Sequence, residues 1–239
     1  MDAKETAEKL LESATRLLGY QVALGVENRE KAKMSYGRIL DAHMTVTGAI
    51  GSALVRNDGV RLKIVGNSQR QIVLIASFIQ GINIVECAIS EGYYIQAAAL
   101  LRQELETIAA LEELKSGTRK DERTPNVKHV PWSLGRLYGD LSKATHAADH
   151  DVLQQTLAPD RSLLPEDTTG VMMTPHFRRE TAWRMMGLHV SLLILVAVHL
   201  DSHYESVMGS GLTEMEASAL HRAQQMLLDE GWLKDVGAL

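Results

Sequence analysis

Cysteine is nearly absent from this 239-residue chain, because Cys87 is the only one. A single thiol can build neither an intrachain disulfide framework nor a cage of thiolate ligands around a metal. The sequence also lacks a Gly-rich phosphate-binding loop, a dinucleotide-binding fingerprint and a Gly-x-Ser-x-Gly nucleophile turn. It therefore carries none of the motifs by which nucleotide-binding α/β folds and α/β-hydrolases are identified.

Uninterrupted apolar runs of membrane-spanning length are missing as well. The most apolar stretches are residues 72–89, which include four polar side chains, and residues 187–200, which include two histidines and a serine. A spanning helix needs about 20 largely uninterrupted apolar residues, so both stretches favour buried core helices. The N-terminal residues show no basic-then-apolar signal. We expect a cytoplasmic protein that does not enter a membrane.

An excess of positive charge is also lacking. The formal net charge is -5, so no global electrostatic attraction favours nucleic acid or an anionic membrane, although a local basic face is compatible with this total. With 45% hydrophobic and 23% charged residues, the composition is that of an ordinary globular protein with a sizeable core.

Helical periodicity of the apolar residues runs through most of the chain. Gly117 is a predicted helix stop, Thr174-Pro175 a predicted helix start, and Thr213 with Glu216 a predicted capping box. The predicted helices cover roughly residues 2–22, 35–50, 68–90, 93–115, 132–157, 175–208 and 213–231.

Two segments depart from this helical pattern. Asn57-Asp58-Gly59 lies between β-type residues and predicts a small hairpin over about 53–65. Residues 158–174 contain two prolines and a glycine and predict a long mobile loop, which could act as a lid. The expected architecture is all-α: a single domain over 1–239, formed by a bundle of six or seven helices with one small β-hairpin.

Two helical turns carry the side chains best suited to chemistry. Arg102 and Glu106 lie four residues apart, as do Ser142 and His146. Residues four apart share a helix face. If the two faces meet, an arginine, a carboxylate, a hydroxyl and an imidazole gather inside a helical core. Such a cluster is either an active site or a structural polar network, and the pattern alone leaves both open.

Histidine spacing suggests a separate possibility, a metal site. His146 with His150, and His199 with His203, both have the i,i+4 spacing of helical metal ligands. Two such pairs on different helices would supply four ligands if they met. The Glu-x-x-His motifs of carboxylate-bridged di-iron bundles are absent. Apart from this alternative, no cofactor is expected.

Residues 91–106 and 138–146 resemble segments of an uncharacterised bacterial all-helical family. That family has a Leu-x-Arg-x-x-x-Glu turn on one helix and a Leu-Ser-x-x-x-His turn on a later one, and some of its relatives resemble HEPN and abortive-infection proteins. The resemblance marks Arg102, Glu106, Ser142 and His146. HEPN ribonucleases have an arginine followed closely by a histidine. Here that spacing occurs between Arg123 and His129, in a predicted loop.

Three functional hypotheses follow from these features. The resemblance implies a HEPN-like, defence-associated protein that cleaves RNA without a metal. In such a protein His146 would be the general acid/base and Arg102 would stabilise the phosphate charge. Glu106 would orient either His146 or Arg102. The second hypothesis is a non-enzymatic scaffold or interaction protein with a structural polar cluster, and the third is a metal-binding bundle. The expected partners are RNA or a protein, and the long apolar helices are compatible with a homodimer.

Overall fold

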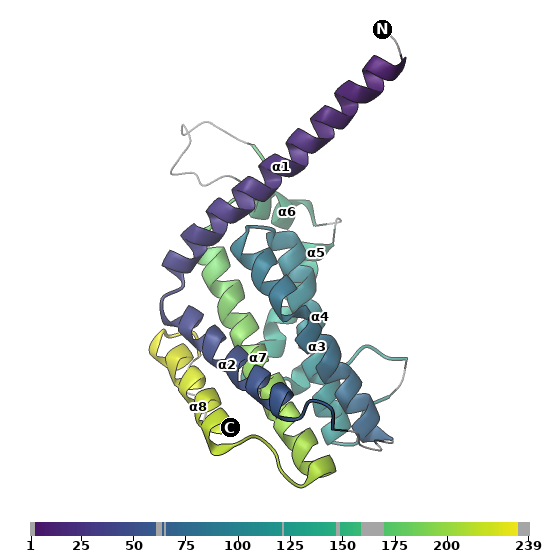
Figure 1. Cartoon of the computed structure of the whole chain (residues 1–239), viewed down its shortest axis with the longest axis vertical. Coiled ribbons are helices and arrows are strands. Elements are labelled where there is room, and N and C mark those ends of the chain that lie inside the picture. The colour runs from purple at the N-terminus through teal and green to yellow at the C-terminus, as the bar shows by residue number, and fades with distance from the viewer. Residues whose placement is uncertain are drawn as a thin grey trace.

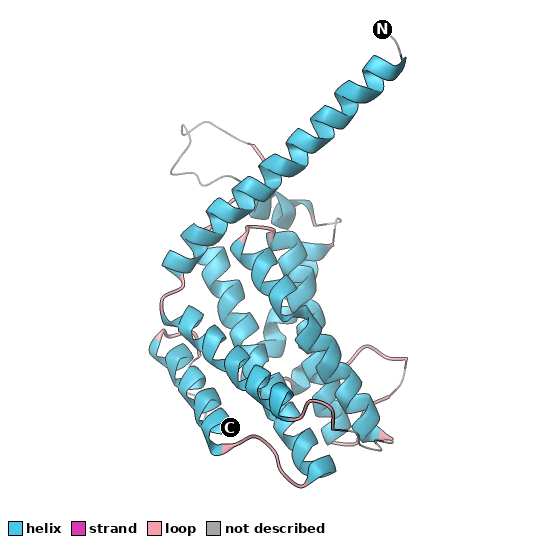
Figure 2. Cartoon of the chain, viewed as in Figure 1, coloured by secondary structure: helices cyan, strands magenta, loops and turns pink. Residues whose placement is uncertain are grey.

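The computed structural model of the chain is an all-α bundle (Figures 1 and 2). It describes residues 3–60, 64, 66–120, 122–146, 149–158 and 170–233. These residues form α1 (Ala3–Ser35), α2 (Arg38–Arg56), α3 (Asn67–Ser90), α4 (Tyr94–Lys115), α5 (Tyr138–Thr145), α6 (His150–Leu157), α7 (Arg179–Met208) and α8 (Glu214–Asp229). Two 3-10 segments, η1 (Val127–His129) and η2 (Pro131–Leu137), precede α5. The all-α prediction is confirmed, with eight helices in the described residues rather than six or seven.

The core of the bundle surrounds α7, which packs against α2, α3 and α4 and also contacts α1 and α8. Between Met186 and Leu200 nearly every side chain of α7 is buried, so this helix is apolar on all sides. On α4, Ala97, Ala98 and Ala109 are fully buried, and their small side chains let neighbouring helices approach closely. The helix α8 lies along α2 and closes the bundle on that side (Figure 1).

Two described helices, α3 and α7, are long and apolar enough to cross a membrane by length and composition. In α7, 78% of the apolar window is buried inside the protein, as expected for a central core helix. In α3 only 28% of the window is buried, because this helix packs on α4 and α7 along one face and leaves Val73 and Ile84 exposed on the other.

The predicted β-hairpin is wrong. Residues 53–56, expected as its first strand, are the last turn of α2, and no strand occurs anywhere in the described residues. Buried Ala53 continues the apolar face that Ala49 and Ile50 present, so packing favours helix here over β propensity. The turn chemistry of Asn57 serves as a helix cap instead, because its backbone and side-chain N–H groups both donate to the Ala53 carbonyl. Residues 61–63 and 65 lie outside the described residues.

The long helix predicted over 132–157 is divided into η2, α5 and α6. The helix expected to start at Pro175 starts at Arg179, because Arg178 is extended, with its N–H donating to the Tyr94 hydroxyl at 2.7 Å. Other predicted boundaries are confirmed: Gly117 follows α4 with φ +70°, and Thr213 with Glu216 forms the capping box of α8.

The predicted mobile loop over 158–174 falls mostly on residues 159–169, which lie outside the described residues. Its last part is tied to the bundle, since the Met172 N–H donates to the Leu157 carbonyl at 2.8 Å. Gly92, which precedes α4 with φ +87°, packs so closely on the His176 backbone that a Cβ at this position would collide with it. The chain leading into α7 is therefore held against the start of α4.

Candidate functional site

Arg102 and Glu106 lie on the face of α4 that packs against α5. The Arg102 Nε atom is 3.7 Å from Glu106 Oε1, and Arg102 Nη1 donates to the Thr145 hydroxyl at 3.5 Å. Both side chains keep about a third of their surface exposed, at 32% and 28%. The pair therefore links α4 to α5 at the protein surface, and the expectation of a pair inside the core is wrong.

Tyr138, at the start of α5, completes this polar network. Its hydroxyl donates to Glu106 Oε1 at 2.7 Å. The hydrogen bond to the Glu106 carboxylate raises the pKa of Tyr138, with smaller contributions from burial and from the negative charge. Ser142, one turn further on, is half-buried, and its carbonyl accepts a hydrogen bond from the Thr145 hydroxyl at 3.0 Å. Three of the four predicted residues therefore gather in one network, together with Tyr138 and Thr145.

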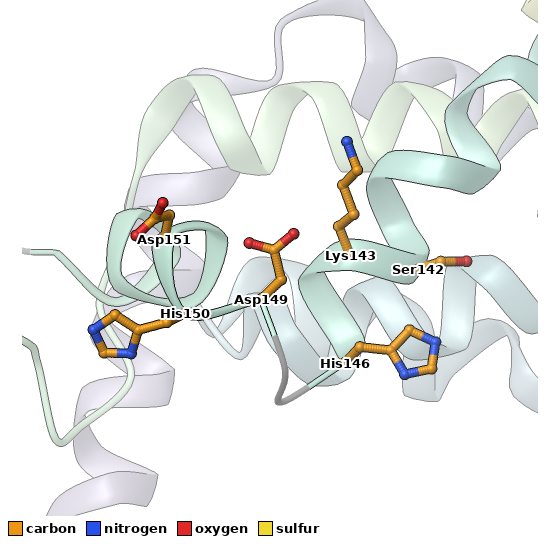
Figure 3. Close-up of a pocket in the computed structure, with 6 residues that line it drawn as sticks. All are labelled: Ser142, Lys143, His146, Asp149, His150 and Asp151. Atoms are coloured by element: carbon orange, nitrogen blue, oxygen red, sulfur yellow. The ribbon is translucent and has the colours of Figure 1, made fainter.

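His146 lies beside this network without joining it. It caps α5 in an extended conformation (φ -88°, ψ 119°), and its N–H donates to the Ser142 carbonyl at 3.0 Å. Its imidazole is exposed. His146 and Ser142 line an open hollow of about 600 Å³, whose other lining residues are Lys143, Asp149, His150 and Asp151 (Figure 3).

The proposed pairing of His146 with His150 on one helix is wrong. His146 ends α5, whereas His150 begins α6, so the i,i+4 spacing does not place them on one helical face. In Figure 3 the two imidazoles point away from each other. Asp149, between them in the chain, accepts a hydrogen bond from the Val152 N–H and caps α6.

The second histidine pair lies on α7 and is engaged elsewhere. His199 Nε2 is 3.1 Å from Glu112 Oε1, and His203 Nδ1 is 3.3 Å from Gln71 Oε1. Both residues are buried, whereas His146 and His150 are exposed. Within the part of the chain that the structure describes, no cluster of three or more His, Cys, Asp or Glu residues could hold a metal.

The opposite side of α5 forms one wall of a second, apolar cleft of about 580 Å³. Its lining comes from η2, from Asp140, Leu141 and Ala144 of α5, from the first turns of α7, and from residues 231–233. All three tryptophans of the chain, Trp132, Trp183 and Trp232, line it. We refer to it as the tryptophan cleft.

Trp232 is held firmly in this cleft. Its indole meets that of Trp183 edge to face, with ring centroids 5.6 Å apart. Its Nε1–H donates to the Ser191 hydroxyl at 2.9 Å, and Ser191 donates in turn to the Gly187 carbonyl at 2.8 Å. A Cβ on Gly187 would lie 2.6 Å from the Trp232 ring, so only glycine permits this packing. The floor of the cleft is therefore preorganised.

The backbone at Trp132, the remaining tryptophan of the cleft, is strained. Trp132 and Ser133 have φ values of 57° and 55°, in the left-handed region that residues with a side chain rarely adopt. Two residues further on, a Cβ on Gly135 would collide with the Val127 carbonyl. Strain of this kind costs about 1–3 kcal/mol per residue, and it is concentrated at functional sites. Here it turns Trp132 toward the cleft.

The rim of the cleft is polar. Exposed Arg136 and Asp140 stand on η2 and α5, and exposed Arg184 stands on α7. Arg184 pairs with Glu180 at 2.6 Å, whereas Arg136 has no ion pair or hydrogen bond to another described residue. An apolar aromatic body with a few polar groups at its edge is the usual composition of a small-molecule site.

A buried polar group in the core was not foreseen from the sequence. His189 Nδ1 lies 3.0 Å from Glu104 Oε2, and both side chains are buried. The ring of buried His43 lies with its centroid 5.5 Å from that of His189. Neither ring nitrogen of His43 has a hydrogen-bond partner among the described atoms. All three side chains are buried, so we assign this group to the core and not to a binding site.

No family model, no curated protein and no solved structure matches the chain. The Arg123–His129 spacing lies in a loop and η1, and the Arg123 carbonyl accepts a hydrogen bond from Arg119. The resemblance to HEPN proteins stays a prediction. Any functional assignment therefore depends on the geometry of the two surface sites.

Proposed function

We propose that this protein is a non-enzymatic binding protein whose ligand is a small apolar carboxylate held in the tryptophan cleft. The observation that carries the proposal is the meeting of all three tryptophans of the chain in one cavity of about 580 Å³. Small-molecule sites have volumes of about 300–1,000 Å³. Tryptophan is also enriched among the residues that contribute most to binding free energy.

The lining of the cleft selects the chemistry of this ligand. Leu134, Leu141 and Leu188 are almost fully buried behind the tryptophans, so they offer an apolar surface to an aliphatic or aromatic body. At the rim Arg136 has no ion pair with another described residue, whereas Arg184 is paired with Glu180, so we assign the binding of an anion to Arg136. A carboxylate matches the planar fork of an arginine.

The Arg102 network has a positioning role in this proposal. Arg102, Glu106 and Tyr138 tie one face of α5 to α4, while Leu141 and Ala144 on its other face form a wall of the cleft. A short helix of eight residues has little stability of its own. The network therefore fixes the wall against which a ligand would pack.

Titration with decanoate tests the proposal through intrinsic fluorescence, because all tryptophan emission arises from residues of the cleft. Decanoate is expected to change the emission with saturation. It should bind more tightly than decan-1-ol, which has the same chain without the charge. Arg136→Gln is expected to reduce decanoate affinity a few-fold, as for one exposed charge pair, and to leave decan-1-ol affinity unchanged. No saturable change with either compound would contradict the proposal.

RNA phosphodiester cleavage is a second candidate function. Its support is that Ser142, Lys143 and His146 line one open hollow beside Arg102. An imidazole and a cation at such a site could serve as general acid/base and phosphate ligand. We expect the protein to cleave single-stranded RNA in the presence of a chelator. His146→Ala should abolish this cleavage, and the control His221→Ala on α8 should retain it. Equal cleavage by both variants would contradict it.

A further inference from the structure

The N-terminal half of α1 extends beyond the bundle with no described helix alongside it (Figure 1). Every side chain from Ala7 to Tyr20 is exposed. Only residues beyond about Gln21 contact the body of the protein, mainly through α3 and α7. An isolated helix of this length is marginal in water, and helices in proteins are stabilised mostly by packing of an apolar face.

The exposed half of α1 has such an apolar face. Leu10, Leu11, Leu17 and Leu18 are 54–70% exposed and Val22 is 66% exposed. With Ala7 and Ala14 they fall on one side of the helix at spacings of three and four residues. We call these seven residues the α1 stripe.

The α1 stripe continues the face by which the rest of α1 packs on the body. Leu11 and Leu18 are followed at the same seven-residue interval by Gly25 and Ala32, and these two are buried. Asn28, on that buried face, donates to the Glu91 carbonyl at 3.0 Å. One continuous seam is thus covered by the protein over its second half and left open over its first half.

The charges around the α1 stripe favour a second copy of this chain as the partner. No charged residue lies within the stripe, so two copies meet there without repulsion between like charges. The opposite face has balanced charge, with the exposed ion pairs Lys9–Glu5 and Arg16–Glu12. A helix that binds an anionic membrane surface has a predominantly cationic polar face, and this one does not.

We infer that the α1 stripes of two copies pack against each other and make the protein a homodimer through α1. Burying five Leu or Val side chains removes roughly 300–600 Å² of apolar surface from each chain. A standard interface buries about 800 Å² per partner, of which about 65% is apolar in homodimers. The two apolar areas are comparable, and a two-fold interface requires a self-complementary patch of this kind.

Analytical ultracentrifugation of the full chain tests this inference. The unsubstituted protein is expected to sediment at twice the mass of one chain, and Leu11→Glu with Leu18→Glu is expected to sediment as a monomer. The matched control, Lys9→Leu with Arg16→Leu on the charged face, keeps the dimer. Residues 9–18 are exposed and lie outside the bundle core. The thermal unfolding midpoint of the bundle, measured for each variant, therefore reports whether that variant folds.

Disulfide trapping supplies a second, independent readout. Ala14 lies at the midpoint of the α1 stripe, so it faces its own copy in either a parallel or an antiparallel pair. Ala14→Cys in a Cys87→Ser background is expected to form a covalent dimer on mild oxidation, whereas Glu12→Cys on the charged face is not. A monomeric unsubstituted protein at tens of micromolar, or a dimer that survives Leu11→Glu with Leu18→Glu, overturns the inference.

Discussion

His43 on α2 and His189 on α7 lie with their ring centroids 5.5 Å apart in the core. Only 6% of His43 and none of His189 is exposed. Burial, with a smaller contribution from His189, lowers the pKa of His43 to about 4 from its ordinary value of 6.5. The folded protein thus keeps His43 neutral over a pH range in which an unfolded chain protonates it.

This difference predicts acid destabilisation through His43. The unfolded state binds a proton at His43 below pH 6.5 and the folded state only near pH 4, so the free energy of unfolding falls as pH decreases through this window. The difference between the two pKa values corresponds to a change of about 3 kcal/mol in the free energy of unfolding.

Urea unfolding at several pH values between 4 and 7 measures this change. His43→Leu is expected to flatten the slope, and His221→Gln, at an exposed position of α8, is expected to keep it. Equal slopes in wild type and His43→Leu would contradict the prediction. Glu104 is present in both proteins, and burial raises its pKa, which gives a slope of opposite sign.

Arg102→Ala is expected to loosen α5 from α4. The substitution removes the ion pair with Glu106 on α4 itself and the hydrogen bond to Thr145 on α5, and the second of these joins two helices. We expect a loss of about 1 kcal/mol, or a melting temperature lower by about 2–4 °C for a chain of this size. Arg184→Ala is the matched control, since its 2.6 Å pair with Glu180 lies within one helix and is exposed. A smaller effect at Arg102 than at Arg184 would argue against a positioning role.

Gly187→Ala is expected to displace Trp232 from the tryptophan cleft. The new methyl group would lie 2.6 Å from the indole ring, and overpacking of this kind costs about 1–3 kcal/mol. The tryptophan emission maximum is expected to shift to the red, and decanoate affinity to fall. Gly81→Ala in α3, where a Cβ meets nothing within 4 Å, should change neither and slightly stabilise the helix. An unaltered emission spectrum in Gly187→Ala would contradict the close packing.

Glu216→Gln is expected to destabilise the contact between α2 and α8. Burial alone would raise the pKa of Glu216, but hydrogen bonds from the Thr213 backbone, Arg56 and Ser52 lower it to about 2. The stabilisation is therefore complete above pH 4.5 and is lost as pH falls toward 2, with a size of about 3 kcal/mol. Chemical unfolding at pH 7 and pH 3 measures it, with exposed Glu214→Gln as control. Equal stability of the two variants at pH 7 would contradict the prediction.

The sequence predicted the helices well because their signals are local. Periodic apolar residues, the Thr213–Glu216 capping box and Gly117 each act within one or two turns, and all are confirmed. The failures arise where distant residues decide. Arg178 is extended because Tyr94 binds its N–H, and no pattern near Pro175 reveals that bond.

The polar network was partly predictable for the same reason. Arg102 and Glu106 are neighbours on one helix, and Ser142 does lie across from them. The helix α5, however, ends at Thr145, one residue before His146, so the His146 side chain does not face them. Tyr138, one turn before Ser142, carried the missing signal, since a hydroxyl on that face can reach Glu106. The tryptophan cleft had no local signal, because its walls come from segments about 40–100 residues apart that only the folded chain brings together.

The position of α7 has a consequence for synthesis of the chain. The helix that holds the core together comes after residue 178, so α2, α3 and α4 leave the ribosome before the surface that covers them exists. During that interval the nascent chain displays its apolar faces to solvent, and transient exposure of this kind attracts chaperones. Translation arrested before residue 179 would therefore yield a chaperone client, and release of that client would require the residues from 179 onward.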